Sequence, residues 1–156
     1  MQRLSVIALC IACLLPACAP VEGRGSDTRR VVAPSTGQLL MEAEWADGHL
    51  HGEFRTWYPS GEPREQGAWE HGLPVGVRTR WHATGHKAEQ GTFADGLREG
   101  PWPSWYEDGQ PEWTGSWQAG ARHGTWTHYA RSGAVLEIEE WERGTRISVA
   151  RVGASS

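Results

Sequence analysis

The feature that most constrains this fold is a repeat of 24 residues. Four blocks align without a gap from Met41, Glu65, Glu89 and Trp113, and a half-block follows from Glu137. Five columns keep their residue type through the four blocks, two of them aromatic and three of them glycine. A repeat of this size is one supersecondary unit, which buries its apolar side only by stacking against its neighbours. The chain is therefore expected to form a repeat array without a thick aliphatic core.

The glycine columns predict tight turns at short and regular intervals. Turn sequences such as Asp47-Gly48 and Ser60-Gly61 recur about every dozen residues. Glycine there can supply the positive φ of a type I turn with a G1 bulge. Between the turns, small or aromatic residues alternate with polar ones, so that Gly67 and Trp69 share a face. A glycine in almost every potential helical turn disfavours helix.

The first aromatic column is expected to form the packed face of the sheet. It consists of Trp45, Trp69, Phe93, Trp117 and Trp141. The residue two positions before each of the first four rings is small, so a ring can lie over neighbouring backbone. By the same alternation this face carries Phe54, Trp102 and Trp126. Arg78 takes the corresponding place in the second block, which we therefore expect to be the most weakly packed.

The second aromatic column points to the opposite face and supplies the candidate binding residues. It consists of Trp57, Trp81, Trp105 and Tyr129. A row of rings separated by two strands could stack sugars or contact a partner protein. The alternative is that these rings simply cover the second face of a thin sheet.

Together these patterns predict an all-β protein. We expect an elongated, single twisted sheet of antiparallel β-hairpins over residues 38–148, with roughly nine strands. Residues 149–156 would form a short C-terminal tail.

The N-terminus predicts export and a lipid anchor. Arg3 precedes a short apolar run, Leu4–Leu15, as in a secretory signal peptide and unlike a membrane span of about 20 residues. Cleavage by the general signal peptidase is one interpretation. The other rests on Leu15–Cys18, which resembles a bacterial lipobox with an uncommon Pro16. Residues 1–17 would then be a lipoprotein signal peptide, and Cys18 would carry the lipid.

The lipobox interpretation also predicts the address of the protein. Ala19 follows Cys18, with no Asp to suggest retention in the inner membrane. We expect the periplasmic face of the outer membrane in a Gram-negative cell. The segment 18–37, rich in Pro, Gly, Ser and Arg, is predicted to be a flexible tether. The three cysteines all lie at or before residue 18, so no other thiol remains for chemistry.

Charge and the spread of polar residues argue against several functions. Residues 41–148 hold 10 Lys and Arg against 17 Asp and Glu, a net charge of −7 that disfavours nucleic acid. The histidines that could suggest metal, His49 with His51 and His82 with His86, flank turns without an evident third ligand. Repeats disperse equivalent residues along a ribbon, whereas catalysis needs unlike groups in one pocket. We expect no metal, no cofactor and no enzymatic activity.

Three short motifs of the block resemble the MORN repeat, and more closely its bacterial variant. They are Gly-x-Trp/Phe at 67–69, 91–93 and 115–117, His-Gly at 51–52 and 123–124, and Trp-Tyr-x-x-Gly at 57–61 and 105–109. The resemblance covers about residues 37–148; Ala43 and Glu139 depart from it by replacing the glycine of the first motif. It implies an elongated stack of hairpins. The bacterial variant occurs in the YwqK-family antitoxins.

The expected function is that of a non-catalytic interaction scaffold at the cell envelope. It would bind an unknown protein partner along its ribbon, and its N-terminal lipid would attach it to the membrane. One alternative is a module that binds peptidoglycan or another glycan through the second aromatic column. Another, implied by the family resemblance alone, is an antitoxin-like protein that neutralises a toxin partner.

Overall fold

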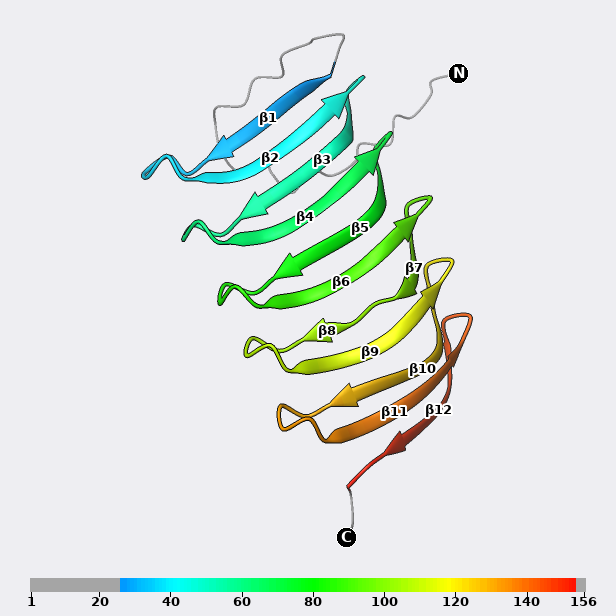
Figure 1. The fold of residues 1–156 in the computed structure, drawn as a ribbon. Helices are drawn as coiled ribbons and strands as arrows, with labels where there is room; N and C mark the ends of the chain where they lie inside the picture. Colours follow the sequence, from blue (N-terminus) through cyan, green and yellow to red (C-terminus); the bar gives the residue numbers. More distant parts are fainter. Residues whose placement is uncertain (1–25, 154–156) are drawn as a thin grey trace, which may run out of the picture.

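The computed structural model describes residues 26–153, which form 12 strands of one antiparallel sheet and no helix (Figure 1). The strands follow one another in chain order, with β7 and β8 end to end in one position between β6 and β9 (Figure 1). Their bounds are β1 Asp27–Val32, β2 Leu39–Ala46, β3 His49–Trp57, β4 Pro63–Glu70, β5 Leu73–Trp81, β6 Lys87–Ala94, β7 Leu97–Pro101, β8 Ser104–Trp105, β9 Pro111–Gln118, β10 Ala121–Tyr129, β11 Val135–Glu142 and β12 Thr145–Arg151.

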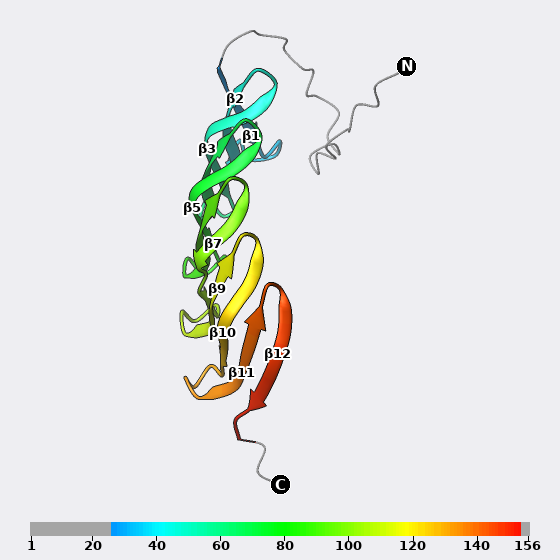
Figure 2. The same cartoon turned by 90° about the vertical axis from the view of Figure 1, so that its right-hand side faces the viewer.

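Seen from its side, the sheet is a single twisted layer (Figure 2). The predicted all-β hairpin array is therefore confirmed. Within residues 26–153 no helix is long and apolar enough to cross a membrane.

The sheet is longer than the sequence predicted at both ends. Strand β1 lies inside the segment predicted to be a tether, and it pairs with β2 from Asp27 opposite Trp45 to Val32 opposite Leu39. Its Arg29 guanidinium lies 4.3 Å from the centroid of the Trp45 ring. The Pro and Gly content of the tether concealed a short strand that covers the edge of the first hairpin. Strand β12 likewise extends to Arg151, into the predicted tail.

The third block contains an interruption that the sequence analysis did not predict. Its second strand is divided into β7 and β8 at residues 102–103. Pro103 cannot donate a backbone hydrogen bond, which weakens a regular ladder at this point. The backbone N–H of Trp102 donates to the carbonyl of Gly115 at 2.9 Å, so the chain between β7 and β8 stays bonded to β9.

The turns along the two sides of the ribbon are of different types. Asp47 and Gly48 both have positive φ, 50° and 79°, as do the central residues of the four equivalent turns. These are two-residue type I′ turns, so the predicted type I turn with a G1 bulge was wrong here. In the longer turns on the other side, Gly61 has a φ of 95° and its N–H donates to Tyr58 O at 2.9 Å. The predicted positive-φ glycine is confirmed there.

One face of the sheet, which we call the ring face, is built from rings packed over glycine. Trp102 lies over Gly91 and Trp126 over Gly115, so closely that a Cβ on either glycine would overlap the indole. Trp102 and Trp126 are buried, with 4% and 3% of their surface exposed. Burying these aromatic rings stabilises a sheet that has no second layer.

The second block packs least tightly, as predicted. None of residues 65–88 is buried. Arg78 replaces the ring of the other blocks, and its side-chain carbons pass over Gly67 at a distance that leaves room for a methyl group. The guanidinium forms an ion pair with Glu65, at 2.7 Å, and lies 5.8 Å from the centroid of Phe93.

The last half-block ends the row of rings with a carboxylate. Strand β12 carries no aromatic residue, and Glu139 stands where earlier blocks have a small residue. Its side chain is buried and accepts hydrogen bonds from Arg146 at 2.7 Å, Trp141 at 2.9 Å and Arg122 at 3.3 Å. Burial alone would raise the pKa of Glu139, but the bonds from Arg146 and Trp141 and the charges of both arginines outweigh it and hold that pKa below its usual value.

Candidate functional site

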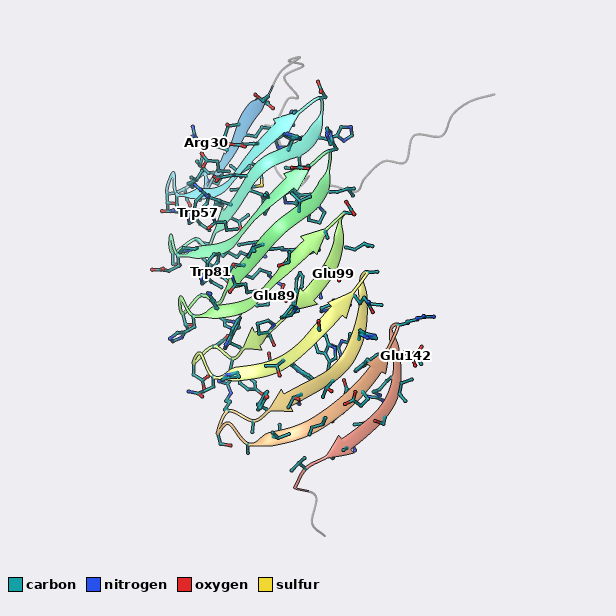
Figure 3. All side chains as sticks on the ribbon, turned by 45° about the vertical axis from the view of Figure 1, so that its right-hand side comes forward. Arg30, Trp57, Trp81, Glu89, Glu99 and Glu142 are labelled. Carbon is teal, nitrogen blue, oxygen red and sulfur yellow. The ribbon has the colours of Figure 1, made fainter. Side chains whose placement is uncertain are left out.

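The candidate residues Trp57, Trp81, Trp105 and Tyr129 lie on the face opposite the ring face, which we call the polar face. Paired residues of an antiparallel sheet share a face, and Thr127 lies opposite Thr114. The Tyr129 hydroxyl is 3.4 Å from that of Thr114, so Tyr129 lies on the same side. All four rings are half-buried. Trp57 and Trp81 lie along the side of the ribbon that carries the longer turns (Figure 3).

A column of hydrogen bonds, missed in the sequence, fixes the backbone of these rings. Tyr58 donates its hydroxyl proton to Trp81 O at 2.8 Å, and Tyr106 donates to Tyr129 O at 2.7 Å. Between them His82 donates from Nε2 to Trp105 O at 2.7 Å. Each bond spans 23 residues, so each joins one block to the next. The signal in the sequence was a polar ring directly after each of the first three aromatic residues of the column, at Tyr58, His82 and Tyr106.

These contacts give the histidines a structural role. The Nδ1 of His86 donates to Glu107 O at 2.7 Å, because a carbonyl oxygen can only accept. His82 Nε2 and His86 Nδ1 are both engaged in hydrogen bonds, so neither atom is available to bind a metal. His51 packs its ring edge to face against His71, at 5.2 Å. Within residues 26–153 no three His, Cys, Asp or Glu side chains are grouped as metal ligands.

The polar face also carries an apolar patch that the sequence analysis did not identify. It consists of Leu73, Val77 and Leu97, which are 53%, 56% and 48% exposed. Val77 lies opposite Thr92, and Leu97 lies opposite Ala94, so both share the face of that part of β6. The two leucines also cover turn glycines of the next hairpin, at 3.2 Å from a Cβ built on Gly96 or Gly120. Their recurrence after the turn glycine was a signal in the sequence.

The ring face, by contrast, carries arginines stacked between rings. The Arg98 guanidinium lies 4.7 Å from Trp102 and 4.8 Å from Trp117, and that of Arg122 lies 4.2 Å from Trp126 and 5.1 Å from Trp141. Cation–π contacts of this kind hold a charged group against an apolar surface. The two faces of the ribbon therefore present different chemistry, with arginines and rings on one side and exposed aliphatic side chains over β5 and β7 on the other.

One further carboxylate has a shifted pKa, and it belongs to a turn. The backbone N–H of Gln110 donates to Asp108 at 3.0 Å and, ahead of the contact with Arg131, lowers the pKa of Asp108. Asp108 is exposed, and this arrangement stabilises the turn between β8 and β9.

The predicted lipid-attachment residue, Cys18, lies outside the described residues.

A single sheet of stacked hairpins, with rings packed over glycines in a 24-residue period, defines the class of β-hairpin repeat proteins. The comparison with known families agrees with this class. Residues 50–71 match the MORN repeat variant. This segment runs from β3 through β4 into the following turn. No curated protein matches the chain.

Proposed function

We propose that this protein is a non-catalytic scaffold, anchored to the cell envelope by a lipid on Cys18, and that its polar face binds a partner protein. The observation that carries the proposal is the apolar patch of Leu73, Val77 and Leu97, on β5 and β7 of that face. Grouped exposed aliphatic side chains are typical of protein interaction surfaces. The MORN-type repeat at 50–71 is consistent with an interaction role.

The rings of Trp57, Trp81, Trp105 and Tyr129 extend this surface toward the longer turns. They are half-buried, so each offers part of its area to a partner. Aromatic residues beside aliphatic ones favour a protein over a glycan, because sugars stack on rings and gain little from Leu or Val. The Lys87 ammonium, 6.0 Å from the Trp105 ring, adds a cation at this edge of the patch.

Photo-crosslinking in the envelope tests the partner. A photoreactive amino acid is placed at Val77, on the polar face, and as a matched control at Val149, which is 44% exposed and lies opposite Glu139 on the ring face. A discrete protein adduct from position 77 and none from position 149 is expected. Equal adducts from both positions, or none, would refute docking on the polar face.

Sedimentation with purified sacculi tests the glycan alternative. The full chain in non-ionic detergent should remain in the supernatant. Co-sedimentation that is lost in the triple variant Trp57→Ala, Trp81→Ala and Trp105→Ala would replace the protein partner with peptidoglycan. If the adduct from position 77 is an exported toxin, the scaffold is an antitoxin of the kind that the family resemblance suggests.

A further inference from the structure

Arg98, on the ring face, is an arginine with no acceptor in the described part of the chain. Its guanidinium lies between the indoles of Trp102 and Trp117, at 4.7 and 4.8 Å from their centroids. Within residues 26–153 its side chain forms no ion pair or hydrogen bond, unlike Arg78 and Arg122. A guanidinium has five N–H donors, and contacts with the faces of rings do not satisfy them as a hydrogen-bond acceptor would. Arg98 therefore keeps donors for an acceptor from outside the chain.

One repeat further along, the chain provides the acceptor itself. Arg122 stands 24 residues after Arg98 and is stacked in the same way, over Trp126 and Trp141. Its Nη1 donates to the carboxylate of Glu139 at 3.3 Å. The fold thus contains one filled example of a carboxylate held by an arginine of this column.

The rest of that carboxylate's environment also recurs one repeat earlier. Glu139 accepts from Trp141 and Arg146 as well, and their equivalents 24 residues before are Trp117 and Arg122. The residue that corresponds to Glu139 is Gly115. The earlier repeat has the corresponding side chains and lacks the carboxylate.

A carboxylate can reach Arg98 only from the solvent side. The space over Gly115 is filled by the ring of Trp126, which meets Trp117 edge to face at 5.7 Å and 90°. The N–H of Trp117 is buried beneath this contact, so it is not a donor to an external group. Arg98 and its two indole walls therefore form the site.

Local charge favours an anion here although residues 41–148 are acidic overall. Along the ring face from β7 to β12, Arg98, Arg122 and Arg146 stand in one column, and the buried Glu139 is shared between the last two. A surplus of positive charge against apolar walls strengthens an ion pair relative to one in bulk water.

We propose that the ring face binds an acidic peptide segment, with the carboxylate of an Asp or Glu side chain paired to Arg98 between Trp102 and Trp117. The site lies on the opposite face from the apolar patch, so it adds a second contact to the proposed scaffold and does not depend on it. A side-chain carboxylate is the favoured ligand because Glu139 shows that this column of arginines accommodates one.

NMR titration of the full chain in non-ionic detergent tests the site. The probe is a capped Gly-Glu-Gly-Glu-Gly peptide, and the same peptide with Gln in place of Glu is its control. The Nε–Hε resonance of Arg98, assigned by its disappearance in Arg98→Lys, should shift with the Glu peptide. Binding should weaken about tenfold or more with the Gln peptide and in Arg98→Gln, because a hydrogen-bonded charge pair is lost. Arg55→Gln, which removes an arginine paired with Glu53 on the polar face, should leave binding unchanged.

Several results would overturn this site. They are an Arg98 resonance that does not move in the wild-type chain, equal binding of the Gln peptide, and undiminished binding to Arg98→Gln. Tighter binding of inorganic phosphate or glucuronate than of the Glu peptide would identify a different ligand and reject the peptide. The titration needs no cellular partner, so its failure is distinct from failure of the crosslink at position 77.

Discussion

Replacing Glu139 by Ala tests the idea that a buried carboxylate closes the end of the array. The change removes one acceptor and leaves three donors, on Arg122, Trp141 and Arg146, without their partner. Breaking a fully buried ion pair costs about 3–5 kcal/mol, but the two arginine side chains are 33% and 50% exposed. Water can solvate them after the change, so we expect a loss of about 2 kcal/mol in the free energy of unfolding.

Urea unfolding of the two single variants Glu139→Ala and Glu137→Ala gives the measurement. Glu137 lies on the same strand and pairs with Arg151 at 3.6 Å, where the arginine is 76% exposed, so its loss should cost about 0.5 kcal/mol or less. The midpoint should therefore fall much further for Glu139→Ala, at an unchanged slope. Equal losses of unfolding free energy in the two variants would refute the idea that Glu139 stabilises the end of the array.

The pH dependence of stability checks the same carboxylate. The pKa of Glu139 is lower in the folded state than in the unfolded state. Its contribution is therefore complete above the unfolded pKa and is lost as the pH falls through the folded pKa. Wild-type stability should decrease below about pH 4.5, and Glu139→Gln should be less stable at pH 7 yet lose less on acidification. Parallel pH profiles for the two proteins would contradict this linkage.

Three further changes probe the repeat and its anchor. Gly115→Ala should cost about 1–3 kcal/mol, because the new methyl group would overlap the Trp126 ring, whereas Gly67→Ala should be nearly neutral over the side chain of Arg78; thermal unfolding of both checks the difference. Tyr106→Phe should cost about 1 kcal/mol through the lost bond to Tyr129 O, and unchanged thermal unfolding would show that this bond is unimportant. Cys18→Ser should move the protein from the membrane to the soluble fraction; unchanged fractionation would exclude the lipid anchor.

The arrangement of hairpins could be predicted because the signal is periodic. Each glycine column marks a turn, and each turn reverses a strand, so the 24-residue spacing alone determines which segments become neighbours. The packed face followed from alternation, since Trp126 falls on the same side as Gly124, and Trp117 on the same side as Gly115, when residues of one strand are counted in twos. Turn type was harder to predict: Asp47-Gly48 is a pair that favours type I′, but the equivalent turns begin with residues such as His71 and Ala119, which give no such signal.

The candidate site could be predicted only in part. Counting along the strands placed Trp57 and Tyr129 opposite the ring face, but how much of each ring is covered depends on contacts with neighbouring strands. Leu73 and Val77 escaped notice because both are unremarkable on their own strand, β5, and they form a patch with Leu97 only when β6 brings β5 and β7 into one sheet. The stacking of Arg98 likewise requires Trp117, which lies on a later strand. Such groupings come from the sheet and cannot be seen in one block.

Because the buried carboxylate of Glu139 closes one end of the array, the interior is free to vary in length. Strand β1 covers the other end, and blocks between the two contact only their neighbours. Gain or loss of one block by recombination would leave both ends intact and change the span by two strands, about 9.6 Å. The span of the ribbon can thus change in fixed steps while its two ends stay the same.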